Sequence, residues 1–200
     1  MSAIVLRQRH RGQRVNTPLL RRIIRSLLDE LLPNDDHELC IHLVAAPEMA
    51  RINQQFLQHE GSTDVITFDY SSFAEPDLPK RPVKPNAHAV LPLPAKRGEG
   101  RGEGTSFRTN NSVRPSQIRP LCGEIYISLD DALTHARVFR TTWQSELVRY
   151  VVHAVLHLHG HDDLQPAARR KMKQQENRWL RFLTARFPLS QLARKTRLPA

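Results

Sequence analysis

Apolar positions along the chain follow two spacings, which predict strands and helices in turn. Short apolar or β-branched runs predict four strands at about residues 3–6, 38–45, 64–68 and 121–128. Apolar residues spaced three and four apart predict five helices at about residues 17–32, 47–57, 129–139, 142–158 and 166–187. Thr141, with Gln144 three residues later, is the predicted cap of the fourth helix. The 200 residues suffice for one domain with a hydrophobic core.

The segment from about residue 71 to residue 120 breaks this pattern. It contains eight of the 14 prolines, four of the eight glycines and two consecutive Arg-Gly-Glu-Gly repeats at residues 97–104. Nine basic and four acidic side chains give it a net charge of +5. Such a composition buries too little apolar surface to offset the entropy cost of ordering the chain. We therefore expect a disordered insertion within one domain spanning residues 1–200.

The net charge of the whole chain is +10, and half of it lies in the predicted insertion. An excess of positive charge favours a polyanionic partner such as nucleic acid, but it also occurs on surfaces that are only solvated. No apolar run is close to the roughly 18 residues that cross a membrane, and the N-terminus has no signal-peptide pattern. The two cysteines, Cys40 and Cys122, fit free thiols in a reducing compartment better than a disulfide. We expect a soluble cytoplasmic protein with no membrane partner.

Residues 151–163 contain the clearest chemical pattern. His153 and His157 stand four residues apart, which places both imidazoles on one face of a helix, one turn apart. Gly160 can adopt the positive φ that ends a helix and turns the chain back, and Asp163 follows three residues later. This spacing supplies three metal ligands and leaves a fourth tetrahedral position for water, as in catalytic zinc sites. We assign no catalytic group beyond this metal-bound water.

The same residues allow two other interpretations. A histidine pair at this spacing also occurs in packed or solvent-facing helices that bind no metal. Metallopeptidases place a Glu directly after the first histidine as general base, and Ala154 in that position argues against a peptidase. Asp162 and His161 are expected beside the site, where Asp162 would orient a ligand histidine.

Three stretches resemble a known family. Residues 63–68 are Thr-Asp-Val-Ile-Thr-Phe, residues 123–128 are Gly-Glu-Ile-Tyr-Ile-Ser, and residues 153–163 are His-Ala-Val-Leu-His-Leu-His-Gly-His-Asp-Asp. In this order they resemble two strands and the metal motif of the YbeY family of bacterial endoribonucleases. Asn53 to Phe56 resembles the helix before the first strand, and Met172 with Glu176 resembles the terminal helix. The likeness covers nearly the whole chain outside the insertion.

This resemblance implies a single α+β domain, with a mixed four-stranded sheet packed with about five helices and a metal site on the long helix. It implies a zinc-dependent endoribonuclease that hydrolyses single-stranded RNA, with one zinc ion held by His153, His157 and Asp163. It also implies work on the small ribosomal subunit, in maturation of the 3′ end of its ribosomal RNA and in ribosome quality control. No feature of the sequence indicates an oligomeric state.

The chain departs from the family pattern at two positions. The third ligand of the family is His, and here it is Asp163, whose charge would make the bound ion less electrophilic. The family places Arg directly after the aromatic residue of its Asn-x-x-Tyr/Phe helix, and here that residue is Leu57. Leu57 motivates an alternative, a non-catalytic RNA-binding factor of ribosome assembly, unless Arg51 or a basic residue of the insertion replaces the missing guanidinium.

Overall fold

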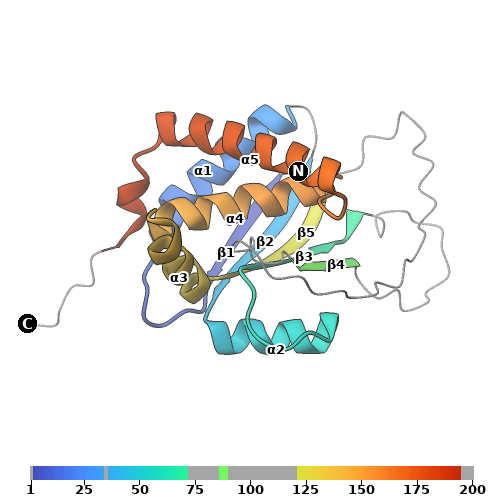
Figure 1. Ribbon diagram of the computed structural model, residues 1–200. Coiled ribbons are helices and arrows are strands. Elements are labelled where there is room, and N and C mark those ends of the chain that lie inside the picture. Colours follow the sequence, from blue (N-terminus) through green and yellow to red (C-terminus); the bar gives the residue numbers. More distant parts are fainter. Residues whose placement is uncertain (1, 34–35, 72–85, 90–120, 195–200) are drawn as a thin grey trace, which may run out of the picture.

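A mixed sheet of five strands forms the centre of the molecule. The computed structural model describes residues 2–33, 36–71, 86–89 and 121–194 (Figure 1). The strand order is β1-β2-β5-β3-β4. Neighbouring strands β1, β2 and β5 are parallel, whereas β3 is antiparallel to both β5 and β4. The strands are β1 (Ala3–Gln8), β2 (His37–Val44), β3 (Val65–Asp69), β4 (Asn86–Ala89) and β5 (Leu121–Ser128).

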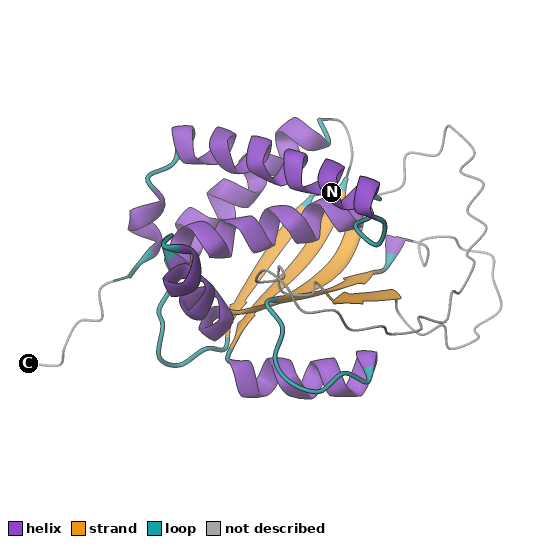
Figure 2. Cartoon of the chain, viewed as in Figure 1, coloured by secondary structure: helices purple, strands orange, loops and turns teal. Residues whose placement is uncertain are grey.

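Helices cover the two faces of the sheet unequally (Figures 1 and 2). Helices α1, α4 and α5 lie together over one face, and α2 lies under the other. None of the described helices combines the length and the apolar character needed to span a bilayer. The helices are α1 (Thr17–Leu31), α2 (Ala46–Leu57), α3 (Leu129–Phe139), α4 (Trp143–Leu158) and α5 (Pro166–Arg186), followed by the 3₁₀ helix η2 (Leu189–Leu192).

Two apolar clusters follow from this arrangement. The larger lies between the sheet and α1, α4 and α5, and it includes Leu39 of β2 and Ile125 of β5, both with no exposed surface. The smaller lies under α2 and contains Val44, Met49, Ile66 and Phe68. Because successive side chains of a strand point to opposite faces, each central strand contributes to both clusters.

The predicted α+β domain with a mixed sheet and five helices is confirmed, and the four predicted strands are present. The sheet also has a fifth strand, β4, whose residues Asn86–Ala89 lie inside the segment 71–120 that we predicted to be disordered. Its sequence lacks β-branched residues, and it forms by pairing backbone to backbone with the edge of β3. The rest of the predicted insertion, residues 72–85 and 90–120, lies outside the described residues.

The cap of α4 differs by one residue from the prediction. Thr142, whose backbone is extended, accepts a hydrogen bond at its hydroxyl from the amide of Ser145 at 3.2 Å. Thr141 instead donates from its hydroxyl to Glu146 Oε1 at 2.6 Å. The helix therefore begins at Trp143.

Gly123 of β5 lets the end of α4 approach the sheet. A Cβ at this position would stand 2.8 Å from Leu158 Cδ1, at the last residue of α4, and 2.9 Å from the backbone oxygen of Phe68 on β3. The backbone oxygen cannot move without breaking the β3–β5 pairing. The absence of a side chain therefore sets the height of the C-terminal end of α4 above the sheet.

We expect Gly123→Ala to lower the free energy of unfolding by about 1–3 kcal/mol, because the added methyl group overpacks this contact. Urea denaturation followed by circular dichroism measures the change. Gly12→Ala is the control, since a Cβ there meets only the side chain of His10, at 3.3 Å. Equal stability of the two variants would contradict the close approach.

Candidate metal centre

Helix α4 holds the two candidate histidines against the core. Its side chains are buried almost all round, from Glu146 to Leu158. His153 is 5% exposed, and the side chain of His157 is 6% exposed. The helix thus presents both imidazoles on a face that is shielded from bulk water and fixed by packing on either side.

Gly160 ends α4 as the sequence predicts. Its φ is +89°, in the region that favours glycine. The amide of Gly160 donates to the carbonyl of His157 and the amide of His161 donates to the carbonyl of Leu156, both at 2.9 Å. This pair of bonds is the Schellman motif, which closes a helix end and reverses the chain. The reversal carries the following residues back toward the last turn of α4.

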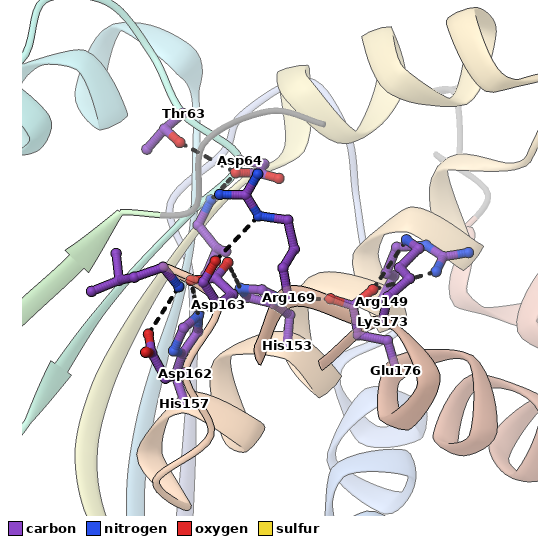
Figure 3. Close-up of polar contacts among 12 residues, drawn as sticks. Thr63, Asp64, Arg149, His153, His157, Asp162, Asp163, Arg169, Lys173 and Glu176 are labelled. Carbon is purple, nitrogen blue, oxygen red and sulfur yellow. Dashed lines mark hydrogen bonds and ion pairs between the residues drawn. The ribbon is translucent and has the colours of Figure 1, made fainter. Parts of the chain in front are cut away.

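The reversal brings Asp163 to the two histidines (Figure 3). The Nε2 atoms of His153 and His157 face each other at 2.8 Å. Asp163 Oδ2 lies 4.0 Å from the Nε2 of His153, and Asp163 Oδ1 lies 3.8 Å from the Nε2 of His157. The three predicted ligands therefore converge, with one donor atom each within 4.8 Å of the others.

This donor set fits a divalent ion. Ligand atoms around a tetrahedral ion at about 2.0–2.1 Å lie roughly 3.3–3.5 Å apart, and the observed separations of 2.8–4.0 Å bracket that value. Two neutral imidazole nitrogens and a carboxylate oxygen suit a borderline metal. Asp163 has a side chain 27% exposed, so the position is open to solvent on that side.

Glu176 of α5 orients His153. The Nδ1–H of His153 donates to Glu176 Oε1 at 2.6 Å, which leaves the lone pair on Nε2 facing His157 and Asp163. Burial acts to raise the pKa of Glu176, but the interactions with His153 and Lys173 outweigh burial and hold that pKa below its ordinary value. Lys173 and Arg149 lie 3.2 Å and 3.7 Å from Glu176 Oε2. Glu176 is thus ionised and fixed in place.

The two residues predicted beside the site, His161 and Asp162, lie in the turn directly before Asp163. Asp162 is exposed, and its carboxylate accepts a hydrogen bond from the amide of Leu164 at 3.0 Å. His161 stacks on His159 with ring centroids 5.7 Å apart. The carboxylate that orients His153 is therefore Glu176, which sequence reasoning used only as a point of resemblance. A Glu on the buried face of the final helix was the signal for it.

Asp64 is a buried carboxyl beside the site. It precedes β3, is 7% exposed, and accepts hydrogen bonds from the amide of Val65 at 3.0 Å and the hydroxyl of Thr63 at 3.2 Å. Burial raises the pKa of Asp64 to about 6, although interactions with His135 and His153 act to lower it. Since His153 affects the pKa of Asp64, this carboxyl lies close enough to the candidate ligands to interact with them electrostatically.

Arg169, in the first turns of α5, is a basic residue beside the site. Its Nε donates to the backbone oxygen of Asp163 at 3.2 Å, and the residue is exposed (Figure 3). Leu57 packs against the smaller apolar cluster, on the opposite face of the sheet from α4. Arg51 is exposed on α2, and among the described residues no contact joins it to the three ligands.

Comparisons with known proteins agree with this geometry. A family model described as Endoribonuclease YbeY matches residues 6–184. A relative named Endoribonuclease YbeY from Salinibacter ruber is 30% identical over 171 residues, which are 86% of this chain and 85% of the relative. A relative of that name from Chlorobium phaeovibrioides is 32% identical over 137 residues, which are 68% of this chain and 62% of the relative.

A solved structure shows the same fold. The solution structure of TM1509 from Thermotoga maritima matches with a TM-score of 0.52 at 20% identity. The match covers 94% of this chain and 93% of that one. The arrangement of strands and helices described above is therefore one that a distant sequence also adopts.

The raised pKa of Asp64 predicts a pH-dependent stability. The folded state keeps its proton up to about pH 6, whereas the unfolded chain loses it near pH 4, so this carboxyl destabilises the fold increasingly between those values. In metal-free protein, the free energy of unfolding of Asp64→Asn, relative to that of the parent chain, should therefore rise by about 3 kcal/mol between pH 4 and pH 7. Urea denaturation at both pH values measures the difference, and an equal difference at both would contradict the burial of a protonated carboxyl.

Proposed function

The chain belongs to the YbeY endoribonuclease family, whose model spans residues 6–184, and from this premise we propose that it is a zinc-dependent endoribonuclease. Its ion would be held by His153, His157 and Asp163. Its substrate would be single-stranded RNA, and its task the maturation of the 3′ end of small-subunit ribosomal RNA and ribosome quality control, in the cytoplasm. The partners would be ribosomal RNA and the small ribosomal subunit.

One observation carries the proposal: three donor atoms from one helix and its following turn converge, and one of the three side chains, Asp163, is 27% exposed. The ligand histidine His153 is held by an ionised carboxylate, Glu176, at 2.6 Å. A histidine that packs only for stability needs no such convergence of lone pairs. The bound ion would act as a Lewis acid on a phosphate oxygen or lower the pKa of a water.

Other side chains of the protein have separate roles in the proposed reaction. Glu176 holds the proton on His153 Nδ1 and so keeps Nε2 available as a ligand. Asp163 contributes one negative charge and, through its backbone oxygen, positions the guanidinium of Arg169. The terminal nitrogens of that guanidinium are suited to a phosphate oxygen.

The charge around α5 supports an RNA substrate. The first turn of α5 contains no acidic residue, and the exposed Arg169 and Arg170 lie near its N-terminus. Positive side chains add there to the partial positive charge of the helix end, a combination that costs folding energy and attracts anions. A phosphate backbone is the polyanion that this potential would bind beside the candidate ligands.

The alternative is a non-catalytic RNA-binding factor of ribosome assembly. Leu57 favours it, because a leucine packed against the smaller apolar cluster cannot contact phosphate as a guanidinium does. The exposed Arg169 beside Asp163 favours the enzyme, because it brings a guanidinium to the site from another element. The two candidates therefore differ in what Arg169 and position 57 contribute.

We expect His157→Ala to lose both the metal and the activity while staying folded. By plasma mass spectrometry, the dialysed variant should contain about one zinc per chain fewer than the dialysed parent protein, because two donors hold an ion far less tightly than three. His159→Ala is the control, since His159 is exposed at the end of the same helix. Undiminished cleavage of single-stranded RNA by metal-free His157→Ala protein would overturn the proposal.

A second pair of variants separates enzyme from assembly factor. If Arg169 contacts phosphate, Arg169→Ala should lower kcat/KM by roughly 10- to 150-fold, the loss of a charged hydrogen bond of about 1.5–3 kcal/mol. Arg170→Ala removes the same charge from the neighbouring exposed position and should have a smaller effect. A parent chain that retains zinc and binds RNA without cutting it, and that gains cleavage in Leu57→Arg, would favour the assembly factor.

A further inference from the structure

A second group of metal-ligating side chains lies on the sheet face opposite α4. Cys40 and His42 alternate with core residues on β2, so both point away from the larger apolar cluster. Glu124 of β5 is the direct register partner of Cys40 on the neighbouring parallel strand. None of these residues takes part in the candidate centre on α4.

The three donor atoms converge on one point. His42 Nε2 lies 2.6 Å from Glu124 Oε1 and 3.3 Å from Cys40 Sγ. All three donor atoms lie within 4.8 Å of one another. His42 is 4% exposed, while the side chain of Glu124 is 27% exposed and Cys40 is half-buried. A small ion can therefore enter from the solvent side and meet a buried imidazole.

The Nε2 atom of His42 faces two acceptor groups. It carries at most one hydrogen, which it can give to Glu124 Oε1 or to Cys40 Sγ. A cation at this point would instead be bound by all three donor atoms.

The surrounding residues hold the donors in place. The ring of Tyr126 stacks on His42 with centroids 4.4 Å apart and planes inclined by 8°. The hydroxyl of Tyr70 donates to Glu124 Oε2 at 3.3 Å, which leaves Oε1 directed toward His42. Such support of ligands by neighbouring groups is usual in protein metal sites.

We propose that Cys40, His42 and Glu124 form a second metal site, for a borderline divalent ion such as Zn²⁺, that ties β2 to β5. Thiolate sulfur, imidazole nitrogen and carboxylate oxygen are all zinc ligands, and sulfur excludes the hard ions Mg²⁺ and Ca²⁺. Binding releases the thiol proton to solvent, and the thiolate and carboxylate together balance the two charges of the ion. The site would stabilise the fold by mass action, independently of any RNA cleavage.

Cobalt(II) distinguishes this site from the one on α4, because only this site contains sulfur. Titration of metal-free protein with cobalt chloride should produce a near-ultraviolet thiolate-to-cobalt charge-transfer band that saturates at about one ion per chain. Zinc should then remove the band, because it binds such ligands more tightly than cobalt does. Since the chain has two cysteines, the band can be assigned by substitution.

Cys40→Ser should abolish the band, and Cys122→Ser, which changes the other half-buried cysteine on β5, should keep it. Retention of the band in Cys122→Ser assigns it to Cys40 even if Cys40→Ser does not fold. Glu124→Gln should weaken cobalt binding at least tenfold while His157→Ala leaves the band unchanged. Absence of the band in folded parent protein, or its persistence in Cys40→Ser, would overturn the proposal without bearing on the ribonuclease.

Discussion

The hydrogen bond between His153 Nδ1 and Glu176 Oε1 is the contact on which the arrangement around α4 depends. It joins α4 to α5, fixes the tautomer of a buried histidine and directs the lone pair of that histidine toward Asp163. Without an ionised partner, a buried imidazole between two helices could rotate or exchange its proton. The hydrogen bond from His153 and the charge of Lys173 hold the pKa of Glu176 below its ordinary value, so a cation near the protein surface helps to determine the charge of a group in the interior.

Packing supplies the second constraint. Helix α4 is buried on nearly every side, and its C-terminal end needs space on the sheet below it. Gly123 provides that space, and Leu158 occupies it. The Schellman turn at Gly160 follows two residues later, so the position of Asp163 depends on how closely α4 sits on the sheet. The precision of the three-donor arrangement is therefore a property of the core, not of the loop alone.

The sheet separates two different chemistries. On the side of α4 the donors are two imidazoles and a carboxylate, beside the cationic start of α5, which suits an ion that works on phosphate. On the side of α2 a cysteine replaces one imidazole, and the donors come from two adjacent strands. An ion bound there would link the parallel strands β2 and β5. The two sites share no residue, and each can be filled without the other.

The sequence by itself determined what depends on neighbours along the chain. Helical spacing placed His153 and His157 on one face, Gly160 ended the helix, and short apolar or β-branched runs identified the four longer strands. These features depend on local periodicity and backbone preference, which the chain carries wherever it folds.

The tertiary structure alone decided which distant groups meet. Glu176 reaches His153 from 23 residues away, and Glu124 reaches His42 from 82 residues away. Strand β4 forms because β3 offers an open edge, and Arg169 meets Asp163 because α5 folds back beside the turn. Such contacts follow from strand register and helix packing, which the burial of the whole core selects and which no short stretch of sequence specifies.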